Sequence, residues 1–160
     1  MTNSTDTFTY SHSDEELINQ PIGYWASTAG AAVVHHIRTM LAEAGLTQPQ
    51  WWILNQLVDT PEGRETADVV AILRGYLGVG DGNLHHDIRA LRERGLLTED
   101  EAGARITITG AGRTLRDDTA VRQGNLRAEI HEGIPDEDYI RTLKVLQRMI
   151  HNVGGEAWHH

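Results

Sequence analysis

The chain of 160 residues contains no cysteine, one phenylalanine and a single lysine, Lys144. Without cysteine, neither a disulfide nor thiol catalysis is possible. No apolar run approaches the roughly 18 to 20 residues that a membrane-spanning helix needs, so we expect no membrane span. The polar, acidic start lacks the basic residues and the apolar stretch of a secretory signal, which predicts a cytoplasmic location. The length fits one domain, or one small domain held in a dimerisation frame.

Charge is unevenly distributed along the chain. The net charge of -9 argues at first against nucleic acid as a partner, because phosphate-binding proteins usually carry a basic surface. Residues 64–116, however, hold eight arginines and eight acidic residues, so this segment is neutral and the remainder carries the negative charge. Arginine binds phosphate and guanine through two parallel hydrogen bonds. The central segment is therefore the part of the chain predicted to face phosphate.

No catalytic pattern is evident. The sequence has no coherent nucleophile and base, no paired carboxylates in an apolar setting and no cofactor loop. Gly78, Gly80 and Gly82 resemble a phosphate-binding loop, but no predicted strand precedes them and no lysine follows, so turn chemistry explains them. The nine histidines form no HExxH-type pair. We expect no enzymatic activity, no cofactor and no metal site, and keep a metal-responsive regulator as an alternative.

Hydrophobic periodicity predicts helices in the first part of the chain. Residues 1–20 are polar and predict a flexible arm. An apolar face with three- and four-residue spacing then predicts a helix that ends at Gly45. Thr47 and Gln50 have the form of a capping box, which predicts a second helix over residues 49–59.

A helix-turn-helix unit is predicted next. Proline and glycine in residues 60–63 indicate a type I turn, and a third helix is expected to begin near Thr66. Glycines at residues 78–80 break it, and Asp81 can cap a fourth helix that Gly95 ends. Its inward stripe is Leu84, Ile88 and Leu91. Two helices joined by a three-residue turn form such a unit.

A hairpin and two more helices complete the pattern. Residues 96–98 and 105–108 are apolar or β-branched and predict a short β-hairpin, so the fold class is mainly α with a small β-hairpin wing. Thr109 can cap a long fifth helix that Gly133 closes, and Pro135 at a first helical position opens a sixth. The apolar residues of the sixth have the four-and-three spacing of helices packed in a bundle or across a dimer: Tyr139, Leu143, Leu146, Ile150 and Val153.

These segments, in this order, resemble the MarR family of bacterial transcription regulators. The likeness is carried by Gly45-Leu46-Thr47-Gln48-Pro49-Gln50-Trp51-Trp52-Ile53-Leu54, Leu77-Gly78-Val79-Gly80-Asp81-Gly82-Asn83-Leu84, Leu91-Arg92-Glu93-Arg94-Gly95-Leu96-Leu97 and Thr109-Gly110-Ala111-Gly112. The resemblance implies a winged helix-turn-helix DNA-binding domain over residues 47–112 and a helical dimerisation region over residues 21–46 and 113–154. It further implies a homodimer on a palindromic operator of double-stranded DNA, often released by a small anionic or phenolic ligand. The function expected is that of a transcriptional repressor.

The fourth helix supplies the predicted DNA contacts. On a wheel of 100° per residue, its inward stripe leaves four residues facing outward and His85 at one shoulder. Asparagine and arginine read adenine and guanine edges, and a glycine lets the backbone approach DNA. The outward residues are Gly82, Asn83, His86 and Arg89. The alternative for these residues is an ordinary solvated face.

The wing departs from the family pattern. Family members carry arginine near the tip, whereas here the tip holds Glu99, Asp100 and Glu101, and only Arg105 remains near the strand start. Arg105 is predicted either to contact DNA or to pair with these acids. Because acidic groups repel phosphate, a winged-helix protein-interaction module with little or no DNA binding is an alternative function.

An effector site is predicted from aromatic and basic residues in the first two predicted helices. The resemblance implies that Trp25, Trp51 and Trp52 lie near the family's effector pocket, where Tyr24, His36 and Arg38 could orient an anionic or aromatic effector. Packing of the tryptophans in the core is the alternative.

Overall fold

The computed structural model describes residues 8–77 and 81–157. It divides into two units, Met1–His35 and His36–His160. None of the described helices is long and apolar enough to cross a membrane.

The first unit holds a short helix and the start of a long one. Helix α1 spans Asp14–Leu17 and follows Ser13, whose backbone N–H and hydroxyl donate to the Glu16 carboxylate at 3.0 and 2.8 Å. These bonds lower the pKa of Glu16. Helix α1 was not predicted, because four residues show no periodic pattern. Helix α2 spans Ile22–Glu43, where the apolar spacing predicted a helix, and it continues into the second unit.

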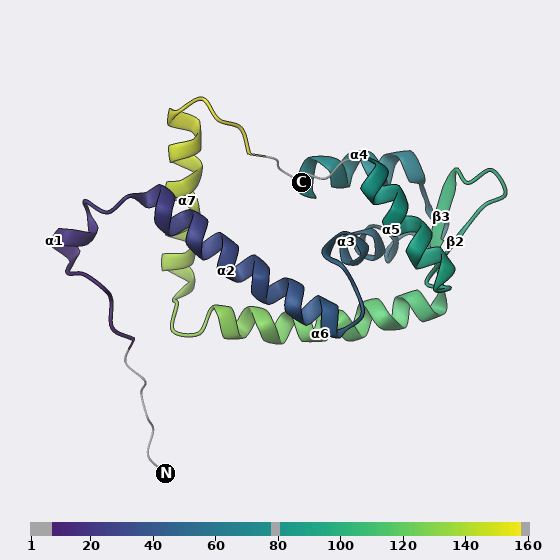
Figure 1. Ribbon diagram of the computed structural model, residues 1–160, viewed down its shortest axis with the longest axis horizontal. Coiled ribbons are helices and arrows are strands. Elements are labelled where there is room, and N and C mark those ends of the chain that lie inside the picture. Colours follow the sequence, from purple (N-terminus) through teal and green to yellow (C-terminus); the bar gives the residue numbers. More distant parts are fainter. Residues whose placement is uncertain (1–7, 78–80, 158–160) are drawn as a thin grey trace, which may run out of the picture. The chain divides into compact units, whose positions relative to one another are not determined.

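The second unit contains the predicted winged helix (Figure 1). Its helix-turn-helix elements are α3 (Gln48–Leu57), α4 (Thr66–Leu77) and α5 (Asp81–Glu93). The wing follows as β2 (Leu97–Glu99) and β3 (Arg105–Ile108), and α6 (Gly110–Ile130) and α7 (Asp136–Asn152) complete the chain. The predicted fold class is confirmed, since the described elements are mostly helices with one small antiparallel sheet.

The core of the second unit lies between α3, α4, α5 and the wing. The predicted inward stripe of α5 is fully buried: Leu84, Ile88 and Leu91 are 0%, 2% and 0% exposed. It packs in one cluster with Leu54 and Leu57 of α3 and with the sheet. A buried leucine or isoleucine contributes about 1.5 to 3 kcal/mol through the hydrophobic effect, so this stripe holds α5 against the domain with a defined face outward.

The sheet has a third strand that the sequence did not predict. Strand β1, Arg64–Glu65, pairs antiparallel with β3, so the strand order is β1-β3-β2 and Arg64 lies opposite Ile106. Two residues are too few to show alternation, which is why only the preceding turn was predicted. In that turn the Gly63 N–H donates to the Thr60 carbonyl at 2.8 Å, and Gly63 has a positive φ of 76°.

The wing is joined to the start of α4 as well as to β1. The Thr66 N–H donates to the Ala104 carbonyl at 2.7 Å. The Thr66 hydroxyl donates to the Gly103 carbonyl at 3.4 Å. Thr66 is the first residue of α4, so the wing loop and this helix share hydrogen bonds at one residue.

Helix α6 begins in close contact with the wing. Thr109 is its N-cap, as predicted, and its hydroxyl accepts from the Gly112 N–H at 3.0 Å. A Cβ on Gly112 would lie 1.9 Å from the Leu96 carbonyl oxygen. Glycine at this position therefore lets α6 approach the strand that leads into the wing.

Helix α7 has no buried residue. Pro135 is its N-cap, with an extended ψ of 144°, and not its first helical residue as predicted. Near the helix start, the Tyr139 ring lies 4.4 Å from the His131 ring and 5.6 Å from the Arg127 guanidinium. Farther along, Leu143 is 41% exposed and Val153 is 84% exposed. Within the described chain, no residue of the predicted apolar stripe is buried, and Leu143 and Val153 are exposed.

Candidate nucleic-acid interface

The outward face of α5 carries most of the predicted DNA contacts. Asn83, His85, His86 and Arg89 are exposed, whereas the stripe on the opposite side is buried. Gly82 belongs to the first turn of α5, but its surroundings lie outside the described residues. Helical periodicity explains the arrangement, because burying one stripe turns the intervening residues to solvent.

Arg89 differs from the other arginines near the end of α5. Arg92 forms an ion pair with Glu99 of the wing, and Arg94 Nη1 donates to the Gly45 carbonyl at 2.8 Å. Within the described parts of the chain, no hydrogen bond or ion pair joins Arg89 to another residue. Its guanidinium can therefore meet a base edge or a phosphate without first breaking a contact within the protein.

The loop before α3 holds α5 in place. Thr47 is the N-cap of α3 and forms the predicted capping box with Gln50. The Thr47 hydroxyl also donates to Asp87 Oδ1 of α5 at 3.1 Å. Asp87 was not among the predicted site residues. A capping motif in sequence does not show which distant residue its hydroxyl will meet.

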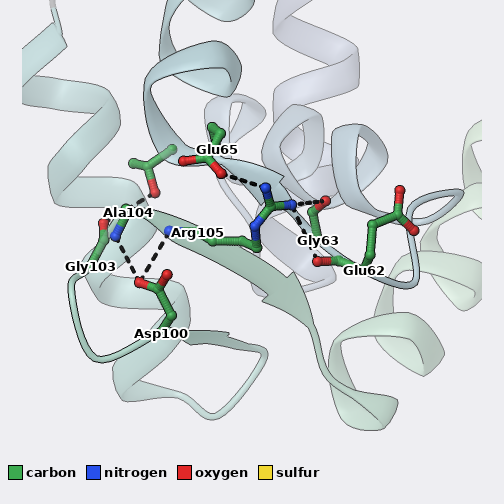
Figure 2. Close-up of polar contacts among 8 residues, drawn as sticks. Glu62, Gly63, Glu65, Asp100, Gly103, Ala104 and Arg105 are labelled. Carbon is green, nitrogen blue, oxygen red and sulfur yellow. Dashed lines mark hydrogen bonds and ion pairs between the residues drawn. The ribbon is translucent and has the colours of Figure 1, made fainter.

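Arg105 is held by the turn beside β1 (Figure 2). Its Nη1 donates to the Gly63 carbonyl at 3.1 Å and to the Glu62 carbonyl at 3.4 Å. Its Nη2 forms an ion pair with Glu65. Of the two predicted alternatives, pairing with acid is present, but the acid comes from β1 and not from the wing tip.

Two of the three acids of the wing, Asp100 and Glu99, have partners within the protein. Asp100 Oδ1 accepts from the Ala104 N–H at 2.8 Å and from the Arg105 N–H at 3.2 Å, which closes the hairpin bend (Figure 2). Glu99 pairs with Arg92. The pair with Arg92 neutralises one negative charge of the wing, but it also engages a cation of α5.

An open pocket of about 470 Å³ borders α5 beside the wing. Arg74 from the last turn of α4 and His85 from α5 both line it, together with Thr66 and the wing loop. Arg74 was missed as a candidate, although a basic residue just before the turn of a helix-turn-helix is a signal that could have identified it. The pocket therefore places one further basic side chain, Arg74, beside His85 on the flank of the α5 face.

The predicted effector residues fall into different environments. Trp51 is only 8% exposed and packs in the core, with the Arg116 guanidinium 5.9 Å from its ring, so core packing accounts for it. Trp52 is partly buried against the same core. His36 Nε2 lies 3.5 Å from Glu129 Oε1, and Arg38 Nε donates to Gln48 Oε1 at 3.1 Å.

Trp25 belongs to the first unit. It is 39% exposed and contacts Tyr24 edge-on, with ring centroids 5.4 Å apart. It also lines an open, mostly apolar pocket of about 580 Å³ with Phe8, Tyr10 and Ile22. Among the described residues, no cluster of three or more histidine, aspartate or glutamate side chains could hold a metal ion.

Several solved structures share this fold along most of the chain. CouR from Rhodococcus jostii RHA1, bound to p-coumaroyl-CoA, has a TM-score of 0.66 and 26% identity over 81% of this chain and 91% of its own. A MarR-family transcriptional regulator from Rhodococcus sp. RHA1 has a TM-score of 0.65 and 25% identity over 87% and 97%. The Mycobacterium tuberculosis MarR family protein Rv2887, in complex with DNA, has a TM-score of 0.63 and 20% identity over 82% and 98%.

No protein-family model and no curated protein matches the sequence. The structural likeness nevertheless covers more than four fifths of this chain in both Rhodococcus structures. The resemblance predicted from the sequence is confirmed, and the chain has the winged helix-turn-helix fold of the MarR family of transcriptional regulators.

Proposed function

We propose that this protein is a sequence-specific regulator of transcription that binds double-stranded DNA as a homodimer. The observation that carries the proposal is that Asn83, His86 and Arg89 of α5 are exposed, whereas the inward stripe of the same helix is fully buried. In a helix-turn-helix protein the second helix enters the major groove, where asparagine reads adenine and arginine reads guanine. The complex of Rv2887 with DNA supports the same use of the fold here.

We expect the wing to contribute less to DNA contact than α5 does. Arg105 is held by two carbonyls and by Glu65, so we assign it to the hairpin and not to the minor groove. Base readout then falls mainly to α5, and phosphate contact to α5 and the flanking pocket. Fewer cations at the interface mean fewer released counterions, so the affinity is expected to depend less steeply on salt than that of a protein with a basic wing.

A binding titration tests the function directly. Duplexes are selected from a random pool with the wild-type protein, and fluorescence anisotropy then compares the selected duplex with a scrambled one of equal composition. We expect the selected duplex to bind roughly 10³-fold tighter or better, which is the range of specific regulators. No retention of any duplex at about 50 mM salt would favour the protein-interaction module, which the engaged wing cations also fit.

The proposed homodimer uses the apolar stripe of α7. Leu143, Leu146 and Ile150 lie on one side of this helix, and none of them is buried in the described chain. An exposed stripe with four-and-three spacing is typical of a helix that packs against a partner. We assign the partner as a second copy of this chain, because two symmetry-related α5 helices can read the two halves of a palindromic site.

Leu143→Glu is expected to break the dimer. The change places a charge on the stripe, and desolvating it should raise the dimer dissociation constant at least about tenfold. Sedimentation equilibrium measures the mass, and the same preparation is titrated with the selected duplex. Val145→Glu is the matched control, since Val145 is 45% exposed against 41% for Leu143 but lies on the other side of α7. Equal dimerisation of both variants would exclude this stripe as the interface.

We further propose that a small anionic or aromatic ligand releases the protein from DNA, as a repressor that responds to a metabolite. The complex of CouR with p-coumaroyl-CoA supports a ligand of this class. His36, Arg38 and Trp52 remain the proposed contacts within the second unit, whereas Trp51 is assigned to the core. Thermal-shift screening of carboxylate and phenolic metabolites can identify the ligand, because a ligand that binds only the folded state raises the melting temperature.

A further inference from the structure

Of the acidic residues of α5 whose burial the structure describes, Asp87 is buried. It is 9% exposed, whereas Arg89, Arg92 and Glu93 on the same helix are exposed. A carboxylate buried without a hydrogen bond is costly, so a partner is expected at this position. The partner is Thr47, forty positions earlier in the chain, whose hydroxyl donates to Asp87 Oδ1 at 3.1 Å.

The Thr47 hydroxyl serves two helices at once. It accepts from the Gln50 N–H at 3.3 Å, as the N-cap of α3, and it donates its own hydrogen to Asp87. A hydroxyl has one donor and two acceptor sites, so the two bonds are compatible. The start of α3 and the middle of α5 are therefore joined through one oxygen atom.

A second bond ties α5 to the same loop. Arg94, just beyond the last residue of α5, donates to the Gly45 carbonyl at 2.8 Å. Residues 87 and 94 are seven positions apart, about two helical turns, so they lie on the same flank beside the buried stripe. An apolar stripe alone tolerates small rotations, whereas hydrogen bonds at two levels define the rotation of α5 about its axis.

We propose that Asp87 is a positioning residue that sets the sequence specificity of DNA binding by fixing this rotation. Asn83 lies one turn before Asp87 on the same flank, and Arg89 and His86 lie around the helix toward solvent. A turn of α5 about its axis would move all three relative to the base edges. The inference rests on the proposed function, since it concerns how the recognition face is aimed.

Asp87→Ala is expected to lower discrimination between the selected and the scrambled duplex by roughly 2- to 30-fold, the range of residues that act through a coupled contact. The variant removes a negative charge from a helix that faces phosphate. From electrostatics alone, Asp87→Ala should therefore bind the scrambled duplex as tightly as the wild type does, or more tightly. Weaker binding to the selected duplex, without weaker binding to the scrambled one, is the expected signature. A loss of folded protein would instead weaken both to the same extent.

Two further variants separate the hydrogen bond from charge and from folding. Asp87→Asn keeps an oxygen that can accept from Thr47 and is expected to retain discrimination within about twofold of the wild type. Thr47→Asp keeps a good N-cap but has no hydrogen to donate and sets two carboxylates against each other. It is expected to lose discrimination as Asp87→Ala does, and it decides the question if Asp87→Ala does not fold.

The results separate a failure of the proposed DNA-binding function from a failure of the role proposed for Asp87. Equal affinity of the wild type for both duplexes overturns the proposed function and the inference with it. A wild type that discriminates, together with folded Asp87→Ala and Thr47→Asp variants that discriminate equally well, overturns the inference alone. Loss of discrimination in Asp87→Asn as large as in Asp87→Ala also overturns it, because the charge and not the hydrogen bond would then be responsible.

Discussion

Replacing Asn83, His86 and Arg89 together with alanine is expected to lower affinity for the selected duplex by roughly 100- to 10,000-fold. Each good base contact is worth about 1 to 3 kcal/mol, and specific binding as a whole exceeds non-specific binding by about 4 to 10 kcal/mol. All three side chains are exposed, so their removal should leave the free energy of unfolding within about 0.5 kcal/mol of the wild type. Anisotropy titration and denaturant unfolding measure the two quantities separately.

The control for this variant is Arg148→Ala. Arg148 is exposed on α7, away from the apolar stripe, and its loss changes the net charge by the same amount as the loss of Arg89. It is expected to shift the affinity for both duplexes slightly and equally, since it alters only the long-range field. If the triple variant bound the selected duplex as the control does, α5 would not be the recognition helix.

Gly112→Ala is expected to destabilise the fold by about 1 to 3 kcal/mol or more, as overpacking of a close contact does. The added Cβ would lie 1.9 Å from the Leu96 carbonyl oxygen and 3.0 Å from Ile108 Cγ1. The carbonyl is not free to withdraw, because it accepts from the Thr109 N–H at 3.1 Å. Urea unfolding at a fixed chain concentration measures the loss.

The same helix supplies a matched control. Gly124 lies in α6 with no heavy atom within 4 Å of an added Cβ, so Gly124→Ala meets no obstacle. Alanine has a higher helix propensity than glycine, and this variant should gain up to about 1 kcal/mol. The two substitutions are chemically identical but are expected to have opposite signs. Equal effects would mean that α6 does not approach Leu96 as closely as described.

Local signals in the sequence predicted most of the fold. The capping residues Thr47 and Thr109 are N-caps, and Gly45 and Gly95, predicted to end helices, have positive φ angles of 72° and 70°. These features depend on residues near each other in the chain, where spacing and side-chain chemistry are sufficient. The structure explains the motif of residues 109–112: Thr109 caps α6, and Gly112 allows α6 to lie close to the wing.

The parts that the sequence did not predict depend on distant residues. Arg64 and Glu65 form strand β1 because they pair with β3. Two residues are too few to show the alternation that predicts a strand. Arg105 was predicted to contact DNA or nearby acids, but Glu65 lies forty positions away in the chain. The role of Asp87 depends on Thr47 in the same way. Secondary-structure propensity and hydrophobic patterns depend on residues that are near each other in sequence. They do not predict these contacts, which form between elements that only the tertiary fold brings together.

Thr66 belongs to the wing as much as to α4, because its backbone and its side chain both bond to the wing loop. The hairpin therefore cannot move on contact with DNA without also moving α4. A duplex that displaced the hairpin would also displace the first turn of α4. Because α4 packs against α5, contact at the wing would then also shift the proposed recognition helix, even if no wing side chain touched a nucleotide.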